Sequence, residues 1–121
     1  MPAKNRDVAS LLDMVGAIQS IQDFTASFSL ETYLENALVQ SAVERQLEIL
    51  GEAATRISPG FRQAHPELDW RRIIGQRNIL IHRYDQIRQE FIWAVIAAEL
   101  VPLRAQLESV LAVLPGDGTS R

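Results

Sequence analysis

Apolar side chains recur at helical spacing along most of the chain. Positions 8, 11, 12, 15, 18 and 21 are apolar, and this spacing predicts an amphipathic helix from Val8 to about Phe24. Residues 25–29 are expected to end that helix and to start a short turn that reaches Leu34. A second long run of helical periodicity extends from Leu38 to about Ile57 and meets the helix-breaking sequence Ser-Pro-Gly at 58–60.

Two further helices are expected in the second half of the chain. Residues 61–68 contain a His-Pro pair, and because proline restricts its predecessor, the segment is expected to be a loop with one helical turn. Asp69 is placed to cap a third helix that runs from Trp70 to about His82. A last helix is expected over residues 88–114, with a kink caused by Pro102.

These elements predict an all-α protein. The sequence contains no convincing strand, repeat or low-complexity block, and 121 residues with 47% hydrophobic content suit a single core. Four helices with short connections form an antiparallel four-helix bundle, here with a short extra helical turn and a kinked last helix. A single domain is expected over residues 1–114, followed by a disordered tail at 115–121, which has no apolar anchor.

Composition indicates where in the cell the protein is expected. No apolar stretch approaches the roughly 20 residues that cross a bilayer, and the N-terminus does not resemble a secretory signal. The absence of cysteine excludes disulfides and thiolate metal sites, so the reducing cytoplasm is the expected location.

The charge of the chain is unevenly distributed. The net charge is -3, yet positions 62–88 carry six arginines and three acids, which gives this window a charge of +3. Arginine forks suit phosphate groups, so the window is either an arginine-rich solvated face or a phosphate-binding patch. The six arginines are Arg62, Arg71, Arg72, Arg77, Arg83 and Arg88.

One position breaks the apolar stripe of the third helix. The stripe contains Trp70, Ile73 and Ile74 and continues at positions 80, 81 and 84, but the intervening position is Arg77. A core-facing arginine needs an anionic or strongly polar partner. The partner is an internal carboxylate, a ligand phosphate or a second chain. The internal carboxylates within reach would be Glu44, Glu48 and Glu52 of the second helix.

The neighbours of Arg77 favour a ligand. Asn78 and His82 are four residues apart and share one helix face with Gly75, which leaves that face open. Arg77 and His82 lie about 140° apart on an ideal helix at roughly 100° per residue, so they do not point at one atom. Either the helix unwinds near His82, or two subunits combine their third helices across a two-fold axis, which we favour.

Arginine, asparagine and histidine together permit RNA cleavage without a metal. A histidine takes the proton of a ribose 2′-hydroxyl, and an arginine fork stabilises the charge that builds on the phosphate. A structural alternative for His82 is the role of a helix C-cap. His65 is expected to have a structural role in its loop. The two histidines lack the spacing of a zinc pair, and no carboxylate cluster supplies a metal site or a cofactor site.

The string from Arg77 to Tyr84, Arg-Asn-Ile-Leu-Ile-His-Arg-Tyr, resembles the motif of the HEPN superfamily, and the tyrosine two residues after the histidine resembles the HepT branch. The resemblance extends to residues 6–14, 47–54 and 70–75 and covers roughly residues 6–112. It implies a homodimeric helical bundle with a composite RNase cleft, acting as the toxin of a toxin–antitoxin system.

The same resemblance implies roles for individual residues. Arg77 and His82 would be the catalytic pair, and Asn78 would support them. An MNT-type nucleotidyltransferase antitoxin would inhibit the toxin by attaching AMP to Tyr84, whose alternative role is an ordinary aromatic at the bundle edge. The remaining arginines near the motif are candidates for RNA binding, whereas DNA, which lacks the 2′-hydroxyl, would be spared. These candidates are Arg71, Arg72, Arg83 and Arg88.

Two other functions are compatible with the sequence. The first is a non-catalytic HEPN dimer that binds a nucleotide or a nucleotidyltransferase partner. The second is a structural bundle in which Arg77 is paired internally. An intact Arg-x4-His motif favours the RNase over the non-catalytic dimer.

Overall fold

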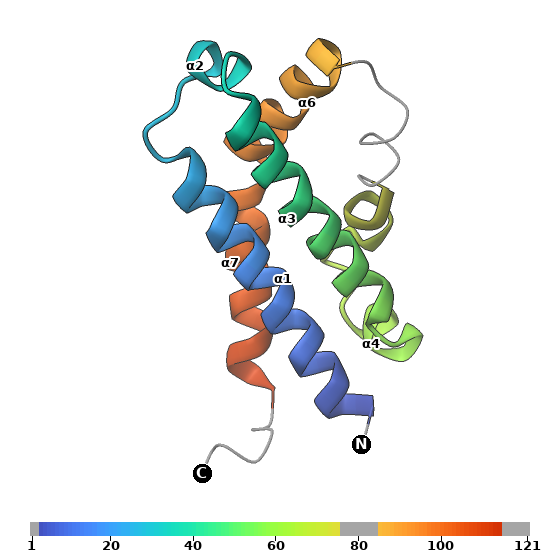
Figure 1. The fold of residues 1–121 in the computed structure, drawn as a ribbon. Helices are drawn as coiled ribbons and strands as arrows, with labels where there is room; N and C mark the ends of the chain where they lie inside the picture. The colour runs from blue at the N-terminus through green and yellow to red at the C-terminus, as the bar shows by residue number, and fades with distance from the viewer. Residues whose placement is uncertain (1–2, 76–84, 115–121) are drawn as a thin grey trace.

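The computed structural model describes residues 3–75 and 85–114. Within these ranges the chain forms helices and short connections without any strand, which confirms the all-α prediction (Figure 1). A further helical segment occupies residues 70–75. The helices are α1 (Ala3–Thr25), α2 (Leu30–Leu34), α3 (Ala37–Arg56), α4 (Pro59–Ala64), α6 (Asp85–Ala98) and α7 (Leu100–Val113).

The core lies between α1, α3 and the C-terminal pair α6 and α7. The helices α1 and α3 run side by side in opposite directions, and α7 packs against α1 from behind (Figure 1). The apolar stripe of α1 is fully buried at three- and four-residue spacing, which is the pattern of a helix with one face in a core. Its members are Leu11, Met14, Ile18 and Ile21, and α3 contributes Val43, Leu47, Leu50 and Ala54 to the same core.

The connection after α3 differs from the sequence-based expectation. The Ser-Pro-Gly sequence does follow the end of α3, but it also begins α4. Ser58 is the N-cap, and its side chain accepts the backbone N–H of Phe61 at 3.3 Å. Pro59 occupies the first helical turn, where its missing N–H costs nothing. The expected single turn within 61–68 is therefore a helix that starts two residues earlier.

The capping role of Asp69 is confirmed. Its Oδ1 accepts the backbone N–H of Arg72 at 3.1 Å, and its carbonyl accepts the N–H of Ile73 at 3.0 Å. The helical segment 70–75 therefore begins where the sequence predicts. The remainder of that predicted helix, to His82, lies outside the described residues, as does the tail at 115–121.

The last long helix is interrupted as expected. It is already helical at Asp85, three residues before the predicted start, and it divides into α6 and α7 at Glu99. Pro102 lies in the first turn of α7, where a backbone N–H would have no partner within α7. The break therefore falls on the N-terminal side of the proline. Of the helices described, none is both long and apolar enough to span a membrane.

Candidate functional site

The predicted motif lies between the two described parts of the chain. Arg77, Asn78, His82, Arg83 and Tyr84 fall in residues 76–84, outside the described residues. The helical segment 70–75 precedes the motif, and α6 follows it directly. The structure therefore defines how the protein holds the chain on either side of the motif.

The segment before the motif is anchored in the core. Trp70 and Ile73 are buried, and Ile74 packs against the same cluster. The indole N–H of Trp70 donates to the carbonyl of His65 at 3.0 Å, and its ring meets Phe61 edge to face at 6.4 Å between centroids. The first half of the predicted apolar stripe is thus confirmed.

Gly75 ends the described part of this segment. An added Cβ atom at Gly75 would meet no atom of the described residues within 4 Å.

An ion pair connects this segment to the junction of α6 and α7. Arg72 Nε donates to Glu99 Oε1 at 2.8 Å, and Arg72 Nη2 donates to Glu99 Oε2, so the pair is bidentate. The hydrogen bond and charge of Glu99 raise the pKa of the Arg72 guanidinium. Glu99 thereby holds the helical segment 70–75 against the junction of α6 and α7.

A buried polar network holds the segment after the motif. Tyr33 of α2 is fully buried, and its hydroxyl donates to Gln89 Oε1 of α6 at 2.6 Å. Gln89, itself 3% exposed, donates through Nε2 to Glu44 Oε2 of α3. Arg88 Nε lies 3.4 Å from the same carboxylate oxygen. This network therefore joins α2, α3 and α6. Its two members on α6, Arg88 and Gln89, follow Tyr84 in the sequence by four and five residues.

The network fixes the charge state of Tyr33. Burial raises the pKa of the Tyr33 hydroxyl well above 10, and the nearby Glu44 carboxylate raises it further, whereas Arg88 lowers it. Tyr33 therefore remains a neutral hydrogen-bond donor at physiological pH.

Alkaline titration is expected to reveal this environment. In a Tyr84→Phe variant, in which Tyr33 is the remaining tyrosine, tyrosinate absorbance should rise only together with unfolding. A folded-state pKa above the unfolded value means that the contribution of Tyr33 to stability is complete below about pH 10 and is lost as the pH rises further. Absorbance near 295 nm and circular dichroism, recorded on the same sample, should change together. Ionisation near pH 10 in the folded protein would contradict the assignment.

The RNA-binding candidates differ in their surroundings. Arg72 and Arg88 contact the carboxylates of Glu99 and Glu44, whereas Arg71 is exposed and forms no ion pair with the part of the chain that the structure describes. Arg83 lies outside that part. Arg71 is therefore the candidate that is open to a phosphate in the described region.

His65 occupies the structural position expected of it. It is the C-cap of α4, its ring lies 4.4 Å from that of Phe61 between centroids, and Nδ1 is 3.1 Å from Glu67 Oε2. A backbone hydrogen bond of Glu67 and the hydrogen bond with His65 lower the pKa of the Glu67 carboxyl. Across residues 3–75 and 85–114, no three histidine and acidic side chains cluster in a way that could hold a metal ion.

The sequence matches the family described as "Ribonuclease HepT-like" over residues 14–110, which is most of the chain and encloses the whole of the motif. The chain belongs to this HepT-like family. The family assignment confirms the resemblance found from the motif, and the helical architecture agrees with it.

Relatives of this HepT-like chain carry related names. A protein of Methanocaldococcus jannaschii named "Putative RNase MJ1380" is 33% identical over 106 residues, which are 87% of this chain and 97% of the relative. A protein of Thermococcus cleftensis named "Probable ribonuclease HepT" is 34% identical over 100 residues, 83% of this chain and 91% of the relative. No solved structure matches the chain significantly.

The pairing of Tyr33 with Gln89 was not predicted from the sequence. These residues are 56 positions apart, and each lies on an apolar helix face where local periodicity gives no partner. A glutamine on the buried stripe of α6 is the available signal, since a buried amide requires hydrogen bonds. Glu44 was considered only as a partner of Arg77, whereas in the described region it bonds to Arg88 and Gln89.

Proposed function

We propose that this protein is a metal-independent endoribonuclease that acts in the cytoplasm as the toxin of a toxin–antitoxin pair. The observation that carries the proposal is the HepT-like ribonuclease match over residues 14–110, within which the Arg-x4-His motif is intact. The names of the relatives also support ribonuclease activity. RNA is therefore the proposed substrate.

The reaction uses the 2′-hydroxyl of the substrate as the nucleophile. His82 accepts the proton of this hydroxyl, or donates one to the departing 5′-oxygen of the next nucleotide. Arg77 stabilises the negative charge on the phosphorus centre during the attack, and Asn78 orients the histidine or the phosphate. The products are a 2′,3′-cyclic phosphate end and a 5′-hydroxyl end.

The active cleft is proposed to contain two chains. An ideal helix separates Arg77 and His82 by about 140°, so one chain does not direct both at the same phosphate. In a homodimer with a two-fold axis, Arg77 of one chain would lie near His82 of the other chain. Within each chain, buried Trp70 and Ile73 fix in the core the helical segment that leads into the motif.

Expression in a bacterial host tests the activity. Wild type should arrest growth and degrade cellular RNA, while Arg77→Ala should do neither at equal protein level. RNA cleavage by extracts should persist in EDTA, and DNA should remain intact. Loss of cleavage in EDTA would contradict the metal-independent mechanism, and RNA degradation by Arg77→Ala would contradict the role of the arginine.

Modification of Tyr84 is the proposed means of control. An MNT-type nucleotidyltransferase would attach AMP to its hydroxyl, which would put a phosphate and a bulky nucleoside close in sequence to His82. The intact mass of the protein after co-expression with such an antitoxin should rise by whole AMP units, and Tyr84→Phe should abolish the rise. A mass increase that persists in Tyr84→Phe would assign the modification to another residue.

A further inference from the structure

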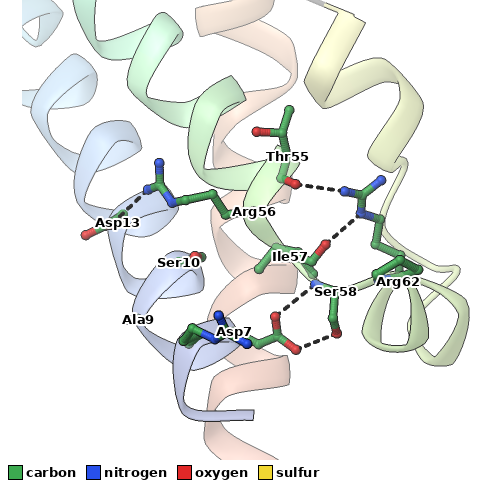
Figure 2. Close-up of a pocket in the computed structure, with 11 residues that line it drawn as sticks. Asp7, Ala9, Ser10, Asp13, Thr55, Arg56, Ile57, Ser58 and Arg62 are labelled. Atoms are coloured by element: carbon green, nitrogen blue, oxygen red, sulfur yellow. Dashed lines mark hydrogen bonds and ion pairs between the residues drawn. The ribbon is translucent and has the colours of Figure 1, made fainter. Parts of the chain in front are cut away.

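A pocket lies at the end of the bundle where α1 begins and α3 passes into α4. Its volume is about 670 Å³, which is within the range of sites for small molecules. Three arginines from three helices line it: Arg6 of α1, Arg56 of α3 and Arg62 of α4. Figure 2 shows Arg56 directed towards α1 and Arg62 on the other side of the end of α3.

Arg62 is held in place by backbone carbonyls. Its Nε donates to the carbonyl of Ile57 at 3.1 Å, and its Nη2 donates to the carbonyl of Thr55 at 3.0 Å (Figure 2). These bonds use two of the five guanidinium N–H groups, and no ion pair with a described carboxylate uses the others. A guanidinium fixed in this way loses little entropy when it binds an anion.

The other two arginines are accessible. Arg56 Nη2 is 3.3 Å from Asp13 Oδ2, and the two side chains are 53% and 57% exposed. An exposed pair of this kind contributes at most about 1 kcal/mol, so an incoming anion can replace the carboxylate. Arg6 is exposed and forms no ion pair with residues 3–75 or 85–114.

The carboxylates of the pocket do not cancel this positive charge. Asp7 is 4% exposed, and its two oxygens accept the backbone N–H of Ser58 at 2.9 Å and its hydroxyl at 2.7 Å. Both oxygens of Asp7 are therefore used in hydrogen bonds that join α1 to the start of α4. Three guanidinium groups against Asp7 and Asp13 leave the lining with a charge of +1, in a chain with a net charge of -3.

We propose that this pocket binds the phosphate group of a nucleotide unit, carried either by an RNA strand or by a free mononucleotide. Arginine forks match the geometry of phosphate oxygens, and the volume accommodates the attached nucleoside. Arg56 lies 12 residues after Glu44 on α3, or about 18 Å along a helix, so the pocket is separate from the network at the start of α6. The RNA form of this inference rests on the proposed function.

A matched pair of variants tests the pocket. Arg56 and Arg45 both lie on α3, and each forms an exposed ion pair, at 3.3 Å and 3.4 Å respectively, but only Arg56 lines the pocket. Binding of labelled 2′-O-methyl RNA, which cannot be cleaved through the 2′-oxygen, is measured by fluorescence anisotropy, and AMP binding is measured by calorimetry. Arg56→Gln should weaken binding roughly tenfold, and Arg45→Gln should change it less than about twofold.

The outcomes separate the two sources of phosphate. Weaker binding of both probes by Arg56→Gln and by Arg6→Gln assigns the pocket to a nucleotide phosphate in general. Weaker binding of the RNA alone, with a salt dependence reduced by about 0.7 per lost contact, assigns it to the RNA backbone. Equal binding of both probes by Arg56→Gln and Arg45→Gln overturns the inference, as does a wild type that binds neither probe.

The same experiment distinguishes failure of the pocket from failure of the proposed function. A wild type that cleaves ordinary RNA while Arg56→Gln binds both probes normally overturns the pocket alone. A wild type that binds AMP through Arg56 without cleaving RNA retains the pocket and overturns the nuclease.

Discussion

Replacement of His82 by alanine should reduce RNA cleavage by about 10²- to 10⁴-fold, the contribution expected of a general acid or base. The loss follows from removal of the group that moves protons to and from the ribose and the leaving oxygen. Single-turnover cleavage of a short labelled RNA by purified protein measures the effect, and thermal unfolding verifies that the variant is folded. The variant should still bind uncleavable RNA, because the arginines that contact phosphate are unchanged.

His65→Ala provides the matched control. His65 is the other histidine of the chain, and it stacks on Phe61 beside Glu67 at the end of α4. Its removal should alter stability modestly and leave the cleavage rate of the folded protein within a few-fold of wild type. Equal cleavage by His82→Ala and wild type would refute the catalytic role of His82, and a large loss in His65→Ala alone would move that role to His65.

Gln89→Leu should lower the free energy of unfolding by about 2–4 kcal/mol. The substitution removes the acceptor of the Tyr33 hydroxyl, which is fully buried, and the amide that donates to Glu44. A buried donor without an acceptor costs its full desolvation penalty. Urea unfolding followed by circular dichroism measures the change. Gln106→Leu on α7 removes an exposed hydrogen bond to the Glu67 carbonyl, 3.4 Å long, and should stay within about 0.5 kcal/mol of wild type.

A double-mutant cycle isolates the contact between Tyr33 and Gln89. Tyr33→Phe removes the hydroxyl that Gln89→Leu leaves without an acceptor, so the double variant should be less destabilised than the sum of the single variants. A coupling of about 1–2 kcal/mol is expected. Additive effects would show that the 2.6 Å contact contributes little to stability.

Most of the fold could be predicted from local signals. The stripes of α1 and α3 have strict helical spacing, and Asp69 and Pro102 act as sequence reasoning expects of a cap and a break. Ser58-Pro59-Gly60 was interpreted only as the end of a helix. The same residue types also favour the first turn of a helix, and here they begin α4. A serine N-cap followed by proline satisfies both descriptions, and tertiary packing decides between them.

The candidate site divides in a similar way. The motif residues were found because Arg77 interrupts an apolar stripe, a conflict that local periodicity makes visible. The supporting contacts were not predicted, because Arg72–Glu99 and Tyr33–Gln89 join residues 27 and 56 positions apart. Such pairs depend on how helices meet, which helical periodicity does not encode. The roles of Arg77, Asn78, His82 and Tyr84 stay predictions.

The chemical ends of the RNA fragments test the central claim most directly. Purified wild type is incubated with a short RNA in EDTA, and the fragments are identified by mass spectrometry. Attack by the 2′-hydroxyl predicts 2′,3′-cyclic phosphate and 5′-hydroxyl ends, together with complete resistance of a substrate that carries a 2′-deoxy nucleotide at the cut. Fragments with 3′-hydroxyl and 5′-phosphate ends, or cleavage at the 2′-deoxy position, would contradict the mechanism.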